Sequence, residues 1–220
     1  CKQQACCGDP IIYTVDATFK SDNTCKLQFR DVQKAIDHLK GSYANEEGYR
    51  YVTVDNGSYN LNQPVVINVC YYDDTPNDPT LAYTYRGTTH TGMTAGNVAP
   101  THVNLIEDIN KNATNKANIL TIKAGNNKAK PWVHHVVIRN SKNITLDSLC
   151  IYSDPTGLKD NALEIDVNSS SWPSITPSFT DANITISNCM IGSAGFTGLH
   201  VSGYDGITFK GNDIEASFAD

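Results

Sequence analysis

The chain has 220 residues, of which 18% are charged and 40% are hydrophobic, and its formal net charge is -6. This length suits a single domain with a substantial core. The mildly acidic balance leaves no basic stripe to neutralise phosphates, so we expect no nucleic-acid partner. No apolar run approaches the roughly 20 residues that a helix needs to cross a bilayer, so we expect that the chain does not span a membrane.

The first ten residues, CKQQACCGDP, are polar and begin with a cysteine. A chain that starts at Cys1 resembles a mature bacterial lipoprotein, in which that cysteine carries the lipid. The resemblance implies a tether over residues 1–10, a lipid on Cys1, and a position on the bacterial outer membrane, at the cell surface. The alternative is that the sequence starts at an arbitrary point.

Seven cysteines are present. They stand at positions 1, 6, 7, 25, 70, 150 and 189. A lipid on the first leaves an even six, which favours disulfide bonds in an exported protein. Adjacent Cys6 and Cys7 are expected to have separate partners, with Cys25 the nearest in sequence. Cys150 and Cys189 lie in apolar strands, where a buried free thiol and a bridge are both open. No CxxC pair or His-Cys cluster at ligand spacing predicts a metal site.

The N-terminal elements are a strand and then a helix. Residues 11–18 read IIYTVDAT, a β-rich run that ends in a turn. In the segment LQFRDVQKAIDHLKG, Phe29, Val32, Ile36 and Leu39 recur at helical spacing and a glycine follows. We therefore predict one amphipathic helix here.

From residue 51 onward the chain consists of short β-rich runs, each bounded by Gly, Asn, Asp or Pro. The stretch 71–114 interrupts them, and because it is too long for a simple corner we predict that it is an insertion. Its aromatic and acidic residues are candidates for a ligand surface. Alternatively, this insertion covers the helix or docks to a partner protein.

Three nine-residue segments, NITLDSLCI, NITISNCMI and GITFKGNDI, resemble one another, and a second type of strand recurs between them in NALEIDV and TGLHVSG. Their alignment superposes Ile144, Ile184 and Ile207, then Leu146, Ile186 and Phe209, then Ile151, Ile191 and Ile214, and finally Leu163 and Ile165 with Leu199 and Val201. Two kinds of strand thus recur in turn along the chain. This pattern indicates that the chain winds in successive coils, each stacked on the one before. Stacked coils bury their aliphatic residues in one column, with the strands paired in parallel.

This coil pattern resembles the pectin-lyase-like superfamily, whose fold is the right-handed parallel β-helix. The resemblance covers roughly residues 29–214. The segment FRDVQKAIDHLKG, placed before YRYVTVDNGSYNLNQPVVI, is similar to the family's helix that caps the N-terminal end of the stack. The resemblance implies a single all-β domain over residues 11–220, with about five coils and an N-terminal amphipathic capping helix.

The catalytic motifs of this superfamily are largely missing from the chain. The Gly-Ser-Tyr turn at 57–59 is similar to a turn of the pectinesterases, but their catalytic segments with Gln and paired Asp are not found. The chain is similar in cadence to the polygalacturonases, but the stretch that corresponds to their Asn-Thr-Asp-Gly segment, 159–162, reads Lys-Asp-Asn-Ala. Their later acid pair aligns with Phe196 and Thr197, so both acid positions depart from the pattern. Because inverting hydrolysis needs two carboxylates that flank the scissile bond, we do not expect galacturonase chemistry.

Outward polar residues of several coils form the candidate site. If the aliphatic residues of NALEIDV point inward, period-two alternation turns Glu164 and Asp166 outward. The same alternation turns Lys123, Arg139 and His200 outward on other coils, and we predict that all five share one sheet face, where this superfamily has its usual substrate cleft. The functional interpretation is that the acids hold Ca²⁺ or a sugar while Arg139 or Lys123 is the base of a lyase. The alternative is a solvated strand face with charge pairs across strands.

Trp132 is a further candidate for ligand binding, since an indole ring offers a platform on which a sugar can stack. The alternative is that it covers an apolar edge at the start of a strand. Apart from Ca²⁺, no cofactor is predicted.

Two functions are compatible with the sequence. The first is an extracellular carbohydrate-active enzyme, either a polysaccharide lyase or a glycoside hydrolase, or else a sugar-binding β-helix. The second is a non-catalytic surface lipoprotein, accessory to an outer-membrane system for the uptake of glycans or peptides. The missing catalytic signatures, the small number of coils and a last coil without an evident cap favour the second. Its partners would be the membrane, a transporter complex, and a polysaccharide or peptide ligand.

Overall fold

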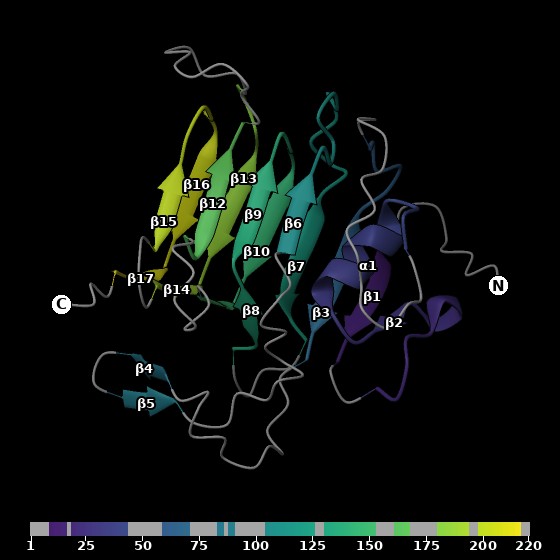
Figure 1. Cartoon of the computed structure of the whole chain (residues 1–220). Coiled ribbons are helices and arrows are strands. Elements are labelled where there is room, and N and C mark those ends of the chain that lie inside the picture. Colours follow the sequence, from purple (N-terminus) through teal and green to yellow (C-terminus); the bar gives the residue numbers. More distant parts are fainter. Residues whose placement is uncertain are drawn as a thin grey trace.

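The computed structural model describes residues 9–16, 19–43, 59–70, 83–85, 88–90, 104–125, 130–152, 161–167, 180–193 and 198–216. Within these residues the protein is all-β, with three parallel sheets and very little helix, as predicted. Figure 1 shows the strands lined up in a row, with helix α1 at the end where β1 and β2 lie.

The largest sheet has seven strands in the order β16-β13-β10-β7-β3-β1-β2. Its members are β1 (Ile11–Val15), β2 (Gln28–Phe29), β3 (Val65–Val69), β7 (Leu120–Ala124), β10 (Ile144–Asp147), β13 (Ile184–Ser187) and β16 (Ile207–Lys210). Every neighbouring pair in it is parallel. The strand expected near residue 11 is confirmed as β1.

Two further parallel sheets have four strands each. One has the order β17-β14-β11-β8, with β8 (Trp132–His134), β11 (Cys150–Tyr152), β14 (Met190–Ser193) and β17 (Asp213–Ala216). The other has the order β15-β12-β9-β6, with β6 (Asn104–Glu107), β9 (Val136–Arg139), β12 (Leu163–Asp166) and β15 (Leu199–Val201). A separate antiparallel hairpin pairs β4 (Tyr83–Tyr85) with β5 (Thr88–His90).

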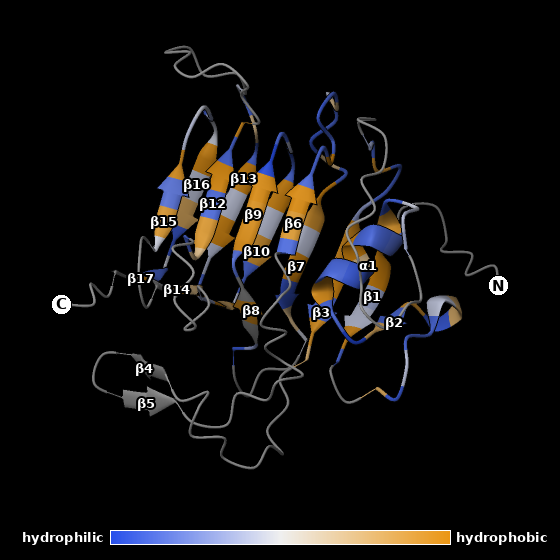
Figure 2. Ribbon diagram, viewed as in Figure 1, coloured by the Kyte–Doolittle hydropathy of each residue, from blue (hydrophilic) through white to orange (hydrophobic). Residues whose placement is uncertain are grey.

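From β7 onward the chain visits the three sheets in a constant order. We use the word circuit for each set of three strands in that order: β7-β8-β9, β10-β11-β12 and β13-β14-β15. Each circuit therefore adds one strand to every sheet, so that segments far apart in the sequence become neighbours. Figure 2 shows apolar residues concentrated on these stacked strands and polar residues at many of the connections between them.

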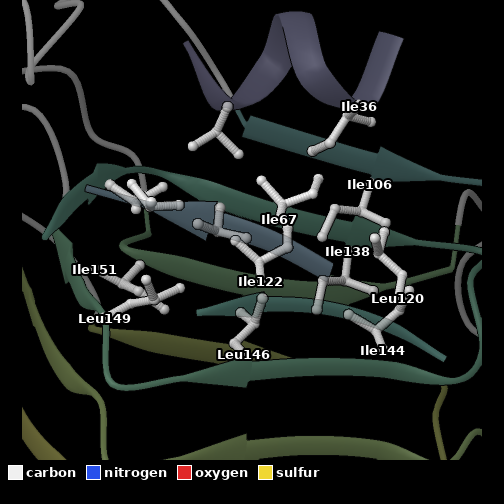
Figure 3. Close-up of a cluster of buried hydrophobic side chains, with 14 of the residues drawn as sticks. Ile36, Ile67, Ile106, Leu120, Ile122, Ile138, Ile144, Leu146, Leu149 and Ile151 are labelled. Carbon is white, nitrogen blue, oxygen red and sulfur yellow. The ribbon is translucent and has the colours of Figure 1, made fainter. Parts of the chain in front are cut away.

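The aliphatic alignment read from the sequence is confirmed by the strand register. Ile144 pairs with Ile184, which pairs in turn with Ile207. The same holds for the other aligned positions: Leu146 with Ile186 and Phe209, Ile151 with Ile191 and Ile214, and Leu163 and Ile165 with Leu199 and Val201. Ile144 and Ile184 are fully buried in one continuous core, part of which is drawn in Figure 3. Burial of this column is the main stabilising contribution to the fold.

Helix α1 (Val32–Leu39) covers one end of this core. Asp31 caps it, because its Oδ1 accepts hydrogen bonds from the backbone N–H groups of Gln33 and Lys34 at 2.6 and 3.4 Å. Ile36 is fully buried and lies at the same end of the column as Ile67 and Ile106 (Figure 3). The predicted helix is thus present but shorter than the apolar spacing suggested, since Phe29 lies in β2.

The side chain of Gln33 joins α1 to the edge of β6. Its Oε1 accepts a hydrogen bond from the backbone N–H of Leu105 at 2.7 Å, and its Nε2 donates to the carbonyl of the same residue at 3.4 Å. One amide side chain therefore supplies the acceptor and the donor that a further parallel strand would offer to β6.

The predicted insertion 71–114 is too long by several residues. Its last part includes β6, whose Ile106 is fully buried in the core, and Ile109 just beyond it, which forms a bridge with Tyr59. The burial pattern of β6 is continuous and lacks the polar-apolar alternation of strands such as β10, β12 and β13, which explains the wrong boundary. Apart from the backbone of β4 and β5, residues 71–103 lie outside the described part, and so does the ligand surface proposed for them.

Four of the seven cysteines lie in the described residues. Cys25 is disulfide-bonded, whereas the thiols of Cys70, Cys150 and Cys189 are free. The alternative left open for Cys150 and Cys189 is therefore decided in favour of buried free thiols. The bridges predicted for Cys6 and Cys7, and the tether 1–10 with its lipid, concern residues that are almost all outside the described part.

Candidate functional site

The candidate site lies on the outer face of the sheet β15-β12-β9-β6. Along β12, Leu163 and Ile165 are fully buried in the core, while Glu164 and Asp166 alternate with them and are partly exposed. In β9, Arg139 occupies the position beside Asp166. The predicted outward orientation of these three charged residues is therefore correct.

Arg139 binds both acids of β12. Its Nε donates to Oδ1 of Asp166 at 2.8 Å and its Nη2 donates to Oδ2 of the same carboxylate at 2.9 Å. The same Nη2 also donates to Oε1 of Glu164 at 3.2 Å. The bond to Asp166 is thus bidentate, the geometry in which a guanidinium holds a carboxylate most firmly.

The electrostatics of the cluster favour a charged arginine. The hydrogen bond to Asp166 raises the pKa of Arg139, and the negative charges of Asp166, Glu164 and Glu107 act in the same direction, against the opposing effect of burial. Glu107 reaches this group because it is the register partner of Arg139 on the next strand, β6. An arginine in this setting keeps its proton and cannot act as a general base.

Asn161 extends the cluster at the start of β12. Its Nδ2 donates to Oε2 of Glu164 at 3.1 Å, so both oxygens of that carboxylate are engaged. Its backbone carbonyl is hydrogen-bonded to Nδ1 of His135. Sequence reasoning noted this residue only within the polygalacturonase cadence, since nothing in a single asparagine shows that it will meet a carboxylate three positions later.

His200 lies on the same face, as predicted. It is the register partner of Glu164 on β15 and its side chain is exposed. Two of the five proposed neighbours, Glu164 and His200, therefore sit directly across from each other on adjacent strands.

The position predicted for Lys123 is wrong. Lys123 belongs to β7 in the seven-stranded sheet, where its register partners are Asn68 and Asp147. The sequence did not show to which sheet β7 belongs, because strands of both sheets carry outward polar residues. Lys123 was therefore assigned to the wrong sheet. The polar patch predicted on one face is therefore two groups on two sheets: Arg139 with the acids, and Lys123 with Asp147.

Asp147 forms the centre of this second group, which sequence reasoning missed. Its Oδ1 accepts hydrogen bonds from Oγ of Ser187 at 2.7 Å and from Nδ2 of Asn188 at 3.0 Å. Burial alone would raise the pKa of Asp147, but these hydrogen bonds, the contact with Ser148 and the charge of Lys123 together lower it. The available signal was the alignment itself, which sets Asp147 beside Ser187 and Lys123 once the register is known.

Trp132 is the first residue of β8, in the sheet β17-β14-β11-β8, and is therefore not part of either group. Its side chain lies outside the described part, so the stacking platform remains a prediction. Among the described residues, no group of three or more His, Cys, Asp and Glu side chains is arranged to hold a metal ion.

Searches for a matching family model, for a similar curated protein and for a similar solved structure gave no match. The helices of the described part are too short and too polar to cross a membrane.

Proposed function

We propose that this protein is a non-catalytic, lipid-anchored surface protein that serves an outer-membrane uptake system for glycans or peptides. The observation that supports it best is the engagement of Arg139 with both Glu164 and Asp166. The three residues with the strongest claim to catalysis bind one another, which suits a rigid binding face better than a reacting centre.

The chemistry of either candidate enzyme is difficult in this arrangement. A lyase needs a base that accepts a proton, whereas the pKa of Arg139 is raised by its bond to Asp166. A glycoside hydrolase needs two carboxylates on opposite sides of the scissile bond. Glu164 and Asp166 instead share one face of β12 and one arginine.

We further propose that the circuits wind as a right-handed parallel β-helix closed at one end by α1. The constant order in which the chain visits three parallel sheets supports this proposal, as does the burial of Ile36 in the shared core. A crystal structure tests it, because left-handed winding or three sheets that do not enclose one column would contradict it.

The catalytic question is tested with purified protein and a panel of pectic and host-type glycans. We expect no rise in ultraviolet absorbance, which reports the unsaturated products of a lyase, and no new reducing ends. Clear turnover of any glycan that is lost in the variant Asp166→Asn would overturn the non-catalytic proposal.

Ligand binding on this face is tested by calorimetry with the same glycans and with peptides, with and without Ca²⁺. We expect Asp166→Asn to weaken binding, because the amide disrupts the bidentate contact that orients Arg139. Asp147→Asn is the matched control, since it changes a hydrogen-bonded aspartate on the other sheet. Equal effects of the two variants would place the ligand elsewhere.

The membrane role has its own tests. Mass spectrometry of the native protein is expected to show a lipid on Cys1, and Cys1→Ser is expected to move the protein from the detergent phase to the aqueous phase. A pull-down from detergent-solubilised membranes should return a transporter subunit. Failure to find the lipid would contradict the anchor, and failure to find a transporter would contradict the accessory role.

The second candidate function is a sugar-binding or carbohydrate-active β-helix. It is favoured by the position of Arg139, Glu164, Asp166 and His200 on one outer sheet face. Carbohydrate binding without turnover is compatible with both proposals, so the pull-down distinguishes them.

A further inference from the structure

The network around Arg139 leaves one part of its guanidinium unused. Asp166 and Glu164 accept hydrogen bonds from Nε and Nη2, whereas Nη1 forms no hydrogen bond with any described residue. The two N–H groups of Nη1 are therefore available as donors to a ligand. Because Asp166 holds the guanidinium through two hydrogen bonds, these donors are oriented before a ligand binds.

Glu107 flanks Arg139 on the strand opposite to Asp166. It is the register partner of Arg139 on β6, and its negative charge contributes to the raised pKa of that arginine. The hydrogen bonds and ion pairs of Arg139 go instead to the two acids of β12. Within the described part, the carboxylate of Glu107 forms no hydrogen bond or ion pair, so its oxygens are available as acceptors.

A free donor and a free acceptor on neighbouring strands suit the hydroxyl groups of a sugar. A hydroxyl group both donates and accepts hydrogen bonds, so a pair of them can accept from Nη1 of Arg139 and donate to Glu107. The main chain of an extended peptide instead pairs with the edge of a sheet. Strands β9 and β12 are paired on both sides and offer no edge. The arrangement therefore favours a glycan over a peptide.

The charge of this face narrows the kind of glycan. At the outward positions of β6, β9 and β12, the carboxylates of Glu107, Glu164 and Asp166 are accompanied by a single guanidinium, that of Arg139. The formal charge of these positions is therefore negative. A sugar acid would bring a further carboxylate to them, and like charges placed together oppose binding.

We propose that the outer face of the sheet β15-β12-β9-β6 binds a neutral glycan and discriminates against glycans that carry carboxylates, with Glu107 as the residue that determines this preference. The inference rests on the proposed function, because it names the ligand of the same site. His200 is exposed on β15, three strand spacings or about 14 Å across the sheet from β6. An extended glycan that crosses the strands can therefore contact both ends of the face.

One polymer in two charge states provides matched ligands. Fully methyl-esterified polygalacturonan is neutral, and de-esterification exposes its carboxylates without changing the sugar backbone. Calorimetry with both forms, and with neutral galactan, arabinan and glucan, is expected to show binding of at least one neutral chain. We expect the de-esterified polymer to bind at least about 10-fold more weakly than the best neutral chain. Equal or tighter binding of the de-esterified polymer, binding of peptides alone, or binding of no glycan would overturn the proposal.

The role of Glu107 is tested with Glu107→Gln, which removes the charge and keeps the size of the side chain. We expect this variant to narrow the difference between the best neutral chain and the de-esterified polymer to less than about 3-fold. Asp181→Asn is the matched control, since it removes one negative charge from a side chain that is 84% exposed and precedes β13, in another sheet. An unchanged difference in Glu107→Gln, or the same narrowing in both variants, would contradict the assigned role.

Salt provides a readout on the unaltered protein. Because added salt screens charges, it should reduce the preference for the neutral chain. A preference that does not change with salt would show that shape and not charge excludes the acidic polymer. The lipid on Cys1 and the transporter subunit are detected without any glycan, so a failure of this inference leaves the tests of the membrane role intact.

Discussion

Asn183 donates a hydrogen bond from its Nδ2 to Oδ1 of Asn143, which precedes it by 40 residues, at 3.0 Å. Asn143 in turn donates from its Nδ2 to the carbonyl of Asn115 at 3.1 Å. Both side chains stand at corners with positive φ, 57° for Asn143 and 53° for Asn183. The repeated Asn-Ile-Thr motif is therefore a structural feature, in which asparagine tolerates the left-handed corner and links one circuit to the next.

We predict that Asn143→Ala destabilises the protein by about 3 kcal/mol, from the loss of hydrogen bonds by a buried group and from the left-handed backbone. Urea denaturation provides the measurement. Asn143→Gly is the comparison, because glycine accepts the backbone conformation but restores no hydrogen bond. We expect it to recover about 1 kcal/mol of the loss. If Ala and Gly are equally destabilising, the backbone conformation contributes nothing.

The corner position of the next strand is occupied by Gly206 instead of asparagine, with φ of +81°. A Cβ added there would lie 2.8 Å from the backbone nitrogen of Ala182, which cannot move aside cheaply. Gly41 has a similar φ of +75° but nothing within 4 Å of the same added atom. We predict that Gly41→Ala costs about 1 kcal/mol and that Gly206→Ala costs about 3 kcal/mol. Thermal unfolding of the two variants checks this, and equal losses would show that the close contact is relieved by relaxation.

The sequence predicted most of the fold because the stacked positions repeat the same kind of residue. Ile144, Ile184 and Ile207 can be aligned by eye, and their register follows from that alignment. The strand β6 could not be found in this way, since its four residues carry no period. Its edge is completed by Gln33, a residue 72 positions away from Leu105, and no local pattern encodes such a contact.

The site was harder to predict than the fold. Alternation showed that Arg139 and Asp166 face outward, but not that the two side chains meet in a bidentate ion pair. The separation of Lys123 from them depends on which sheet β7 joins. In the structure β7 pairs with β10, where Leu120 and Ile122 lie beside Ile144 and Leu146.

The ion pair between Arg139 and Asp166 should contribute measurably to stability, because both side chains are largely shielded, at 26% and 19% exposure. A double-mutant cycle with Arg139→Met and Asp166→Asn is expected to give a coupling energy of about 1 to 3 kcal/mol, which decreases as salt is added. The control is the same cycle with Lys116→Met and Asp181→Asn, since Nζ of Lys116 lies 3.5 Å from Oδ1 of Asp181 and the two side chains are 59% and 84% exposed. For such an exposed pair we expect less than about 0.5 kcal/mol. A coupling energy no larger than in the control would show that the pair is only a surface contact.

Among the described residues, the three free thiols should differ in reactivity toward a disulfide reagent. Burial raises the pKa of Cys150 to about 12 and that of Cys189 to about 11, and both side chains are shielded from solvent. Cys70 is only half-buried, although burial and the charge of Asp16 raise its pKa as well. We therefore predict that Cys70 is labelled first in the folded protein and that the other two react only on unfolding. Mass spectrometry of peptides from the labelled protein identifies the sites, and Cys70→Ser should abolish the early phase.

The stability of the N-terminal end should depend on pH through His38. The ring of His38 lies among aromatic side chains, with its Nδ1 3.1 Å from the hydroxyl of Tyr13 and its centroid 5.2 Å from that of Phe29. Burial lowers the pKa of His38 below its usual 6.5. The unfolded chain therefore takes up this proton at a higher pH than the folded protein does. The contribution of His38 to stability is complete above about pH 6.5 and is lost as the pH falls toward the folded pKa. We predict that the Tm of the native protein falls more steeply between pH 7.5 and 5 than that of His38→Asn, whose side-chain amide can form a hydrogen bond with the Tyr13 hydroxyl but does not titrate. Parallel Tm profiles for the two proteins would show that protonation of His38 is not coupled to folding.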